Sequence, residues 1–365
     1  MNINLMKTVP MAATAVGAFL MVSAAAGAES ESWIEQLDFK GDFRLRYEYI
    51  DEQAEAGRER MRFRGRFSFA TGIGDDVKVV VRLATGHGNP VSTNQSFEDG
   101  FSLDDIRLNL AFVDWKIADE MNVYVGKMNN PLFRAGGVPL IWDSDFTPEG
   151  VALRVGSGML FGTLGGFLID KRSGVDDSLL YALQGGLRLS LGENNKLTIG
   201  AGYFAFTNTI GNKPFYKDRP KGNTVDGDGN YVFEYKDVEL FAQFDSEVAG
   251  WPLQLFAHYA RNTAVPVQDT AFAFGARLGS ASKKGQLQFR WMYLDTEADA
   301  VIGTFTDSDF GSGSTDSLGH LLVVKYGISD KLFVGGTFFI NKVDRFQGAE
   351  HDYNRVQIDL EVKFN

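Results

Sequence analysis

The chain has 365 residues, of which 44% are hydrophobic, 13% aromatic and 23% charged, and its formal net charge is −11. The 41 Gly and 30 Phe argue against a mainly helical protein, because aromatic residues favour strands and Gly weakens helix interiors. The lack of Cys excludes disulfide scaffolds, thiolate metal sites and cysteine nucleophiles, and the negative charge argues against a nucleic-acid partner.

The first 28 residues predict a cleaved signal peptide. Lys7 supplies a positive charge, residues 8–26 are uncharged and mostly apolar, and Ala26-Gly27-Ala28 fits the small-residue cleavage pattern. An uncleaved membrane anchor is the alternative. No later stretch approaches the roughly 18 to 20 apolar residues that a membrane helix needs. We therefore expect an exported protein whose mature chain, 29–365, forms one domain.

Alternating side chains dominate the mature chain. Residues 38–49, 60–69 and 355–364 place apolar side chains at every second position and charged or polar ones between them. Only an extended strand separates two such sets onto opposite faces. Further segments of this kind lie at 76–85, 104–115, 121–128, 150–156, 158–170, 177–191, 195–207, 232–246, 251–262, 270–280, 284–295, 316–328 and 330–343.

These segments predict about 16 antiparallel strands, with 14 or 18 as alternatives because 150–156 and 158–170 alternate least. Short turns and long loops follow one another in strict order, as expected of a barrel with turns at its periplasmic end and loops at its extracellular end. A barrel this wide encloses water. Its polar face must then point inward and its apolar face toward lipid, so the fold class is an all-β transmembrane barrel in the outer membrane.

One stretch resembles a known family. Gly126-Lys127 is followed by Trp142-Asp143-Ser144-Asp145 and then by Pro148-Glu149-Gly150. This order is similar to the putative porin family of Gram-negative bacteria and, more loosely, to the phosphate-selective porins. The resemblance implies an outer-membrane channel, a homotrimer, for passive uptake of small polar solutes. Members of the family often end on a Phe, whereas in this chain Asn365 follows Phe364.

By the same resemblance, loop 129–149 folds into the lumen and narrows it. Its composition suits that place, since Trp142 and Phe146 can pack on the wall while Asp143, Asp145 and Glu149 carry charge. The alternative is an outward surface loop with Asp and Pro turn chemistry. This loop is therefore a candidate constriction.

An arginine ladder is the candidate opposite wall. These arginines occupy the water-facing positions of the first four strands, and they are Arg44, Arg46, Arg60, Arg62, Arg64, Arg66, Arg82 and Arg107. Charge that lines a pore sets its ion selectivity. In one interpretation the ladder and the acidic loop create a transverse field. In the other, Asp42, Glu48, Glu59 and Asp104 pair with the arginines as a structural wall network.

We expect a channel for small hydrophilic solutes or ions with an anion preference. A substrate-specific channel for phosphate or an organic anion is the alternative, and a plugged barrel serving as adhesin or anchor is a third. We expect no enzyme, since Ser317 and His320 fall on opposite faces of one strand. No cofactor, metal or nucleic acid is expected, and the partners are the solute, membrane lipid and two further copies of the chain.

Overall fold

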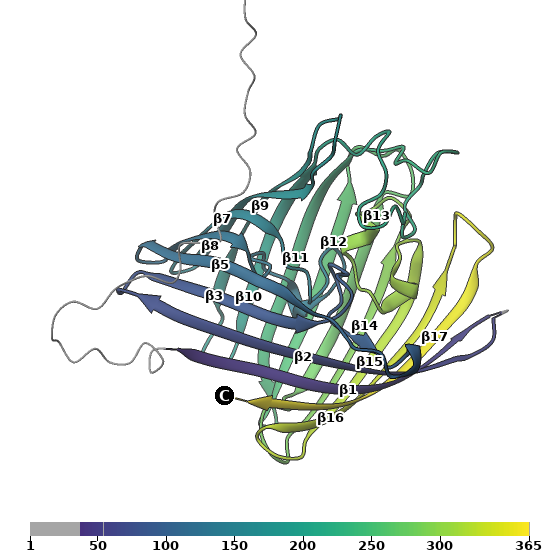
Figure 1. Cartoon of the computed structure of the whole chain (residues 1–365). Helices are drawn as coiled ribbons and strands as arrows, with labels where there is room; N and C mark the ends of the chain where they lie inside the picture. The colour runs from purple at the N-terminus through teal and green to yellow at the C-terminus, as the bar shows by residue number, and fades with distance from the viewer. Residues whose placement is uncertain (1–36, 54, 365) are drawn as a thin grey trace, which may run out of the picture. The chain divides into compact units, whose positions relative to one another are not determined.

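The computed structural model describes residues 37–53 and 55–364, and in them the strands form one closed antiparallel barrel (Figure 1). Seventeen strands are present, of which β4 has two residues and lies in a loop, so sixteen strands form the wall within the described part of the chain. The barrel begins at Asp38. The predicted signal peptide, 1–28, and the predicted start of the mature chain at residue 29 lie outside the described residues.

The first half of the wall is β1(Asp38–Glu52), β2(Arg58–Ile73), β3(Val77–Thr85), β5(Ile106–Ala118), β6(Met121–Lys127), β7(Glu149–Ser157), β8(Leu160–Asp170) and β9(Ser178–Ser190). The second half is β10(Lys196–Phe206), β11(Tyr235–Val248), β12(Trp251–Asn262), β13(Thr270–Gly279), β14(Leu287–Thr296), β15(Ser317–Gly327), β16(Leu332–Val343) and β17(His351–Phe364). The loops hold β4(Gln95–Ser96) and the short 3-10 helices η1(Asp99–Phe101), η2(Ala135–Gly137), η3(Gly303–Phe305) and η4(Phe310–Gly313).

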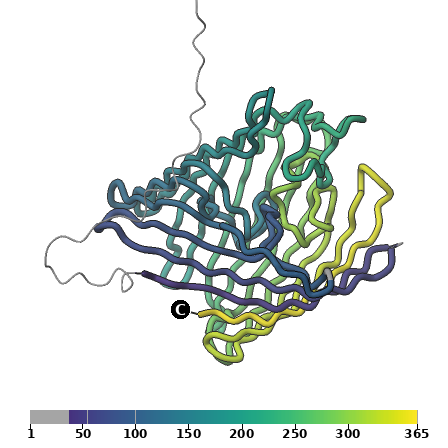
Figure 2. The backbone as a smooth tube through the Cα atoms, viewed as in Figure 1, coloured from purple at the N-terminus to yellow at the C-terminus, as the bar shows by residue number. Residues whose placement is uncertain are grey.

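Each predicted strand segment has its counterpart, including the two weakest, which are β7 and β8. The wall closes where β1 pairs with β17, in a register that runs from Gly41 opposite Phe364 to Glu52 opposite Tyr353. The purple start and the yellow end of the barrel lie side by side in Figure 2. Closure leaves no unpaired strand edge, which is the requirement for backbone inside a bilayer.

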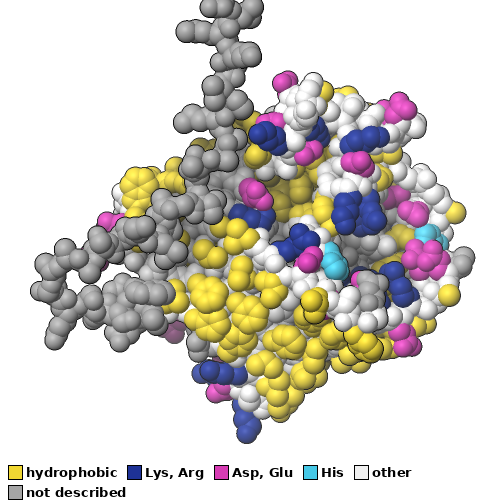
Figure 3. Space-filling view, in the orientation of Figure 1, with side chains coloured by type: hydrophobic (Ala, Val, Ile, Leu, Met, Phe, Trp, Pro, Cys, Tyr) yellow, Lys and Arg dark blue, Asp and Glu magenta, His cyan; other side chains and the backbone are white. Residues whose placement is uncertain are grey.

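The outward face of the wall is apolar, as the alternation predicted. In β17, Ile358 and Leu360 are 51% and 41% exposed, whereas Arg355 and Gln357, at alternate positions of the same strand, are buried inside. Figure 3 shows apolar side chains gathered over the strands and charged ones around the long-loop end. No helix among the described residues is long and apolar enough to cross a bilayer.

The inward face is only partly polar, which corrects the prediction that polar side chains alone face the interior. Phe204, Phe241 and Phe256 are almost fully buried, while their strand neighbours point outward. They belong to one apolar cluster that also contains loop residues such as Trp142 and Phe305. The reason is that long loops fold into the barrel and bury their apolar side chains against this part of the wall.

Candidate functional site

The loop between β6 and β7, residues 128–148, crosses the interior of the barrel; we call it the first inward loop. The backbone N–H of Phe133 donates to Gln184 Oε1 of β9 at 2.7 Å, and that of Gly136 donates to Gln243 Oε1 of β11 at 2.8 Å. Arg290 Nη2 of β14 donates to the carbonyl of Gly136 at 2.9 Å. The loop is therefore fixed to three strands by side chains that face the lumen.

Aromatic side chains anchor the first inward loop. The Trp142 ring stacks on Phe146 with centroids 5.0 Å apart and meets the edge of Phe204 in β10 at 5.2 Å. Phe146 in turn contacts Phe305 at 5.2 Å. Trp142 is 1% exposed. These two aromatic residues thus lie at the junction of the loop, the wall and a second loop.

That second loop, residues 297–316 between β14 and β15, also folds inward; we call it the second inward loop. The Asp143 N–H donates to the Phe305 carbonyl at 2.8 Å, and the Ser308 N–H donates to Asp143 Oδ2 at 3.1 Å. The two inward loops therefore join directly, through the hydrogen bonds of Asp143 as well as through the contact of Phe146 with Phe305.

Each inward loop carries the triplet Asp-Ser-Asp in the same local structure. Asp143 Oδ1 accepts the N–H of Asp145 at 2.6 Å, and Asp307 Oδ1 accepts the N–H of Asp309 at 2.8 Å. A carboxylate that caps the N–H two residues later makes a compact turn. In both turns the first aspartate is used internally, and the second is left free to reach the wall.

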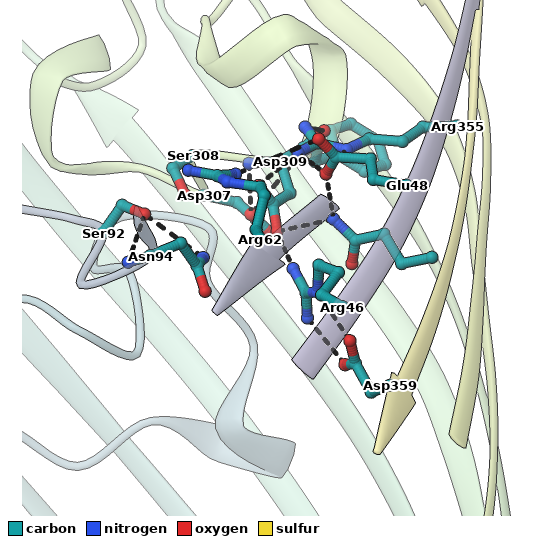
Figure 4. A network of polar contacts seen from close by, with 12 residues as sticks. Arg46, Glu48, Arg62, Ser92, Asn94, Asp307, Ser308, Asp309, Arg355 and Asp359 are labelled. Atoms are coloured by element: carbon teal, nitrogen blue, oxygen red, sulfur yellow. Dashed lines mark hydrogen bonds and ion pairs between the residues drawn. The ribbon is translucent and has the colours of Figure 1, made fainter. Parts of the chain in front are cut away.

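The second aspartate of each turn binds the arginine ladder. Asp145 pairs with Arg66 Nη1 at 3.2 Å. Asp309 pairs with Arg46 Nη1 at 3.0 Å and with Arg355 Nη2 of β17 at 2.9 Å. Figure 4 shows Asp309 between Arg46 and Arg355, which come from the first and the last strand of the barrel. The two loops and the closing seam of the barrel thus meet in one network.

The ladder is also paired within the wall. Across β1 and β2, Arg44 lies opposite Arg64 and Arg46 opposite Arg62. Asp42 accepts from Arg64 and Arg66 at 2.7 Å, and Glu48 accepts from Arg60 at 2.7 Å. Features of both sequence-based interpretations are therefore present: carboxylates of the wall and of the loops bind the same arginines.

Two carboxylates expected in the wall network take no part in it. Glu59 and Asp104 form no ion pair with the ladder among the described residues. The wall carboxylates that sequence reasoning missed are Asp359, which binds Arg46 through two hydrogen bonds of 2.7 Å, and Glu361, which lies 3.6 Å from Arg64. Both stand on the water-facing positions of β17, so its position beside β1 in a closed barrel was the available signal.

Three predicted site residues lie outside this network. Arg82 donates to Asn109 Oδ1 at 2.5 Å, and Arg107 donates to the Gly86 carbonyl and to Asp105. Glu149 is the first residue of β7 and pairs with Lys127 at 2.7 Å. Arg107 and Glu149 line a cavity at the long-loop end whose lining includes none of the four turn aspartates.

Three cavities in the described part of the chain differ in size and in lining. One of about 600 Å³ lies beside the short turns that carry Glu120 and Gly158. Another, of about 800 Å³, lies at the long-loop end beside Arg107 and Glu149. Between the ladder and the two turns is a third, of only about 190 Å³. The smallest space in this series therefore has the most charged lining.

Burial and charge separate the four loop aspartates into two kinds. Burial raises the pKa of Asp143 well above its usual range, and repulsion from Asp307 adds to this. Burial also raises the pKa of Asp307, to about 6, with a contribution from Asp309. For Asp145 and Asp309, burial acts in the same direction, but nearby arginines outweigh it and hold the pKa of both carboxyls below the usual range. Arg66 and Arg64 do so for Asp145, and Arg355 and Arg46 for Asp309.

Other candidate chemistry is not assembled. His320, on the outward face, accepts the indole N–H of Trp291 at 3.3 Å and stacks on that ring, while Ser317 donates to the Ser314 carbonyl. Within residues 37–53 and 55–364, no three His, Asp or Glu side chains are grouped so that they could hold a metal ion.

A comparison with protein families identifies the barrel. Residues 50–221 and 224–364 match the family described as Putative porin. The chain belongs to this family. The porin is accordingly an outer-membrane channel for passive diffusion. A comparison with curated proteins found no match by sequence.

Solved porins share the fold at low sequence identity. The high-pH structure of OprB from Pseudomonas putida aligns with a TM-score of 0.61 and 13% identity, covering 91% of this chain and 95% of OprB. OmpF of Salmonella typhi, solved in complex with daunomycin, gives 0.53 and 11%, covering 90% and 97%. A triple mutant of the Rhodopseudomonas blastica porin gives 0.53 and 10%, covering 90% and 100%.

Proposed function

We propose that this porin admits small polar solutes and prefers anions, and that the choice is made where the arginine ladder faces the two Asp-Ser-Asp turns. The support is the charge of the wall in that region. Seven arginines, Arg44, Arg46, Arg60, Arg62, Arg64, Arg66 and Arg355, stand with four wall carboxylates, Asp42, Glu48, Asp359 and Glu361. Lys325, which pairs with Glu361, is an eighth cation of this wall, so eight minus four leaves an excess of four positive charges before the loop aspartates are counted.

Asp145 and Asp309 of the inward loops pair directly with this wall, whereas Asp143 and Asp307 line the same narrow space without an arginine partner among the described residues. Separated charges of opposite sign create a field across the narrow space, so anions pass along the ladder and dipolar solutes orient in it. Asp143, Asp145, Trp142 and Phe146 form the loop side of this constriction. Glu149 contributes only at the long-loop cavity, through its pairing with Lys127.

The test is the reversal potential of the purified protein in a planar bilayer under a salt gradient. We expect an anion preference that falls on Arg44→Gln and on Arg66→Gln. Arg261→Gln is the matched control, because Arg261 pairs with Asp269 and its side chain is 55% exposed. Cation preference in the unmodified protein would overturn the assignment of anions, and a lack of conductance would favour a plugged barrel that acts as adhesin or anchor.

A substrate-specific channel for phosphate or an organic anion would use the same ladder as its binding track. Phosphate that blocks chloride current at low concentration, with the block relieved by Arg44→Gln, would favour this second function. Unimpeded chloride current in phosphate would favour general diffusion.

We further propose that the short turns face the periplasm, that the long loops face the exterior, and that three copies associate through their outward apolar faces. Light scattering of the detergent-solubilised protein measures the mass of the assembly and therefore the number of copies. A mass of one chain, after correction for detergent, would refute the trimer.

A further inference from the structure

The cavity of about 190 Å³ between the ladder and the inward loops has a mixed lining. Four arginines and four aspartates line it, and Leu321, Val323 and Met292 give it an apolar side. A lining with equal numbers of both charges could be fully self-paired. It is not, and the side chains that are left over determine what the cavity can bind.

Half of these charged groups are already satisfied by hydrogen-bonded partners. Arg46 binds Asp309 and Asp359, and Arg64 binds Asp42. Asp145 binds Arg66, which lies outside the cavity lining. These groups have little charge to offer a ligand.

Two cationic side chains remain without a hydrogen-bonded carboxylate. Arg44 donates to the neutral Asn94 Oδ1 at 2.5 Å, and its buried Nε has no partner. The carboxylate of Asp359 is 3.7 Å from Arg44 and is already bound by Arg46. Among the residues that the structure describes, Arg290 donates only to the Gly136 carbonyl and the Met292 sulfur, and its buried Nε has no partner there.

Two carboxylates remain as well. Asp143 and Asp307 form no ion pair with any Lys or Arg in the described part of the chain. Asp143 accepts the N–H groups of Asp145 and Ser308, and Asp307 Oδ1 accepts those of Asp309 and Phe310. The second oxygen of Asp307 accepts no hydrogen bond from these residues. A buried carboxylate without a counter-charge is costly, so a cationic group placed there is stabilising.

We propose that this cavity is a binding site for a small amino-carboxylate, a solute with one carboxylate, one ammonium group and a short hydrocarbon chain. The carboxylate binds Arg44 and Arg290, the ammonium group binds Asp307 and Asp143, and the chain lies against Leu321 and Val323. A purely anionic or cationic solute compensates only one of the two unpaired sets. This proposal rests on the proposed function, because the solute reaches the site through the lumen.

Matched probes distinguish binding of an anion, of a cation and of a solute that carries both charges. Pentanoate, pentylammonium and 5-aminopentanoate share a five-carbon chain and carry the anion, the cation and both; 4-aminobutanoate and 6-aminohexanoate vary the charge spacing. Isothermal titration calorimetry on the full-length protein in detergent measures binding without conduction. We expect the best amino-carboxylate to bind about tenfold more tightly than either singly charged probe, as one charged hydrogen bond would give. Pentanoate binding as tightly as all three amino-carboxylates would overturn the proposal.

Variants assign the two ends of the ligand. Asp307→Asn should reduce affinity for the best amino-carboxylate about tenfold and leave that for pentanoate no weaker. Arg44→Gln should weaken both probes. Asp226→Asn is the matched control, since Asp226 caps the N–H of Asp228 in an exposed turn of the same kind. Unchanged affinity in Asp307→Asn would overturn the proposal even if Arg44→Gln failed to fold.

The outcome is distinguishable from failure of the channel itself. A protein that conducts ions but binds the amino-carboxylates no better than pentanoate retains its proposed function and lacks this site. A protein that binds them selectively and conducts nothing retains the site and is not a diffusion channel.

Discussion

We expect Asp307 to make the ion selectivity of the porin depend on pH. Its pKa is raised to about 6 by burial and by Asp309, whereas the ladder arginines hold the pKa of Asp145 and Asp309 low. Lowering the pH from 7 to 5 therefore protonates Asp307 and leaves the carboxylates on the ladder ionised. Since protonation removes a negative charge opposite the ladder, the preference for anions should rise as the pH falls.

The size of the effect follows from that pKa. With a pKa of about 6, the ionised fraction of Asp307 falls from about nine-tenths at pH 7 to about one-tenth at pH 5, a change of about 0.8 charge. The narrow cavity is lined by four arginines and four aspartates, and titration of Asp307 makes its net charge about 0.8 more positive at pH 5 than at pH 7. Asp143, whose pKa is also raised, changes the balance in the same direction.

The assay is the reversal potential in a fixed salt gradient, measured at pH 7 and at pH 5. At pH 5 the reversal potential should move toward the value of a perfectly anion-selective channel. Asp307→Asn should show this shifted value at both pH 7 and pH 5. Asp226→Asn, in its exposed turn, should behave like the unmodified protein. A potential that does not change with pH, or one that changes equally in Asp307→Asn, would refute the reasoning.

Three further variants test the loop and the wall. Gly136 has φ +60°, and a Cβ there would collide with the ring of Phe256. Gly136→Ala should therefore displace the first inward loop from the wall and raise single-channel conductance. An unchanged conductance would contradict this position of the loop. Trp142→Ala removes a buried side chain and should lower the free energy of unfolding by about 3–5 kcal/mol, so thermolysin should cleave the first inward loop faster. Equal protection from cleavage would contradict the role of Trp142 as an anchor. Leu360→Arg should cost about 2–4 kcal/mol in unfolding from lipid vesicles if its face meets lipid, and Leu360→Met should cost little.

The wall could be predicted because its signal is local. Over residues 38–49, 60–69 and 355–364 every second side chain is charged or polar, and burial of one face sets the strand direction and the register together. The alternation of short and long connections supplied the closed topology. The ends of strands were predicted less accurately. β1 continues to Glu52 instead of ending at residue 49, and β11 begins at Tyr235 instead of residue 232, because pairing with neighbouring strands decides where a strand begins and ends.

The interior could be predicted only in part because it depends on contacts between distant segments. Phe241 and Phe256 face inward, yet alternation cannot distinguish a lipid-facing from a loop-facing aromatic residue. The role of residues 297–316 was missed although a signal existed, since Asp307-Ser308-Asp309 repeats the triplet of the loop already singled out. Arg355 was missed because only closure of the barrel brings β17 beside β1.

The seam between β1 and β17 has a consequence for the order of assembly. Arg355 with Glu48, and Arg46 with Asp359, join residues separated by almost the whole barrel sequence. Contacts of such high sequence separation form late, because closing a long loop costs less entropy once pairing between strands near in sequence has already ordered the chain. Asp309 can join Arg46 and Arg355 only once those two strands are neighbours. We therefore expect the ion pairs of Asp309 to be the last contacts of the network to form, and protection of residues around Asp309 from proteolysis to report completion of the barrel in a newly inserted chain.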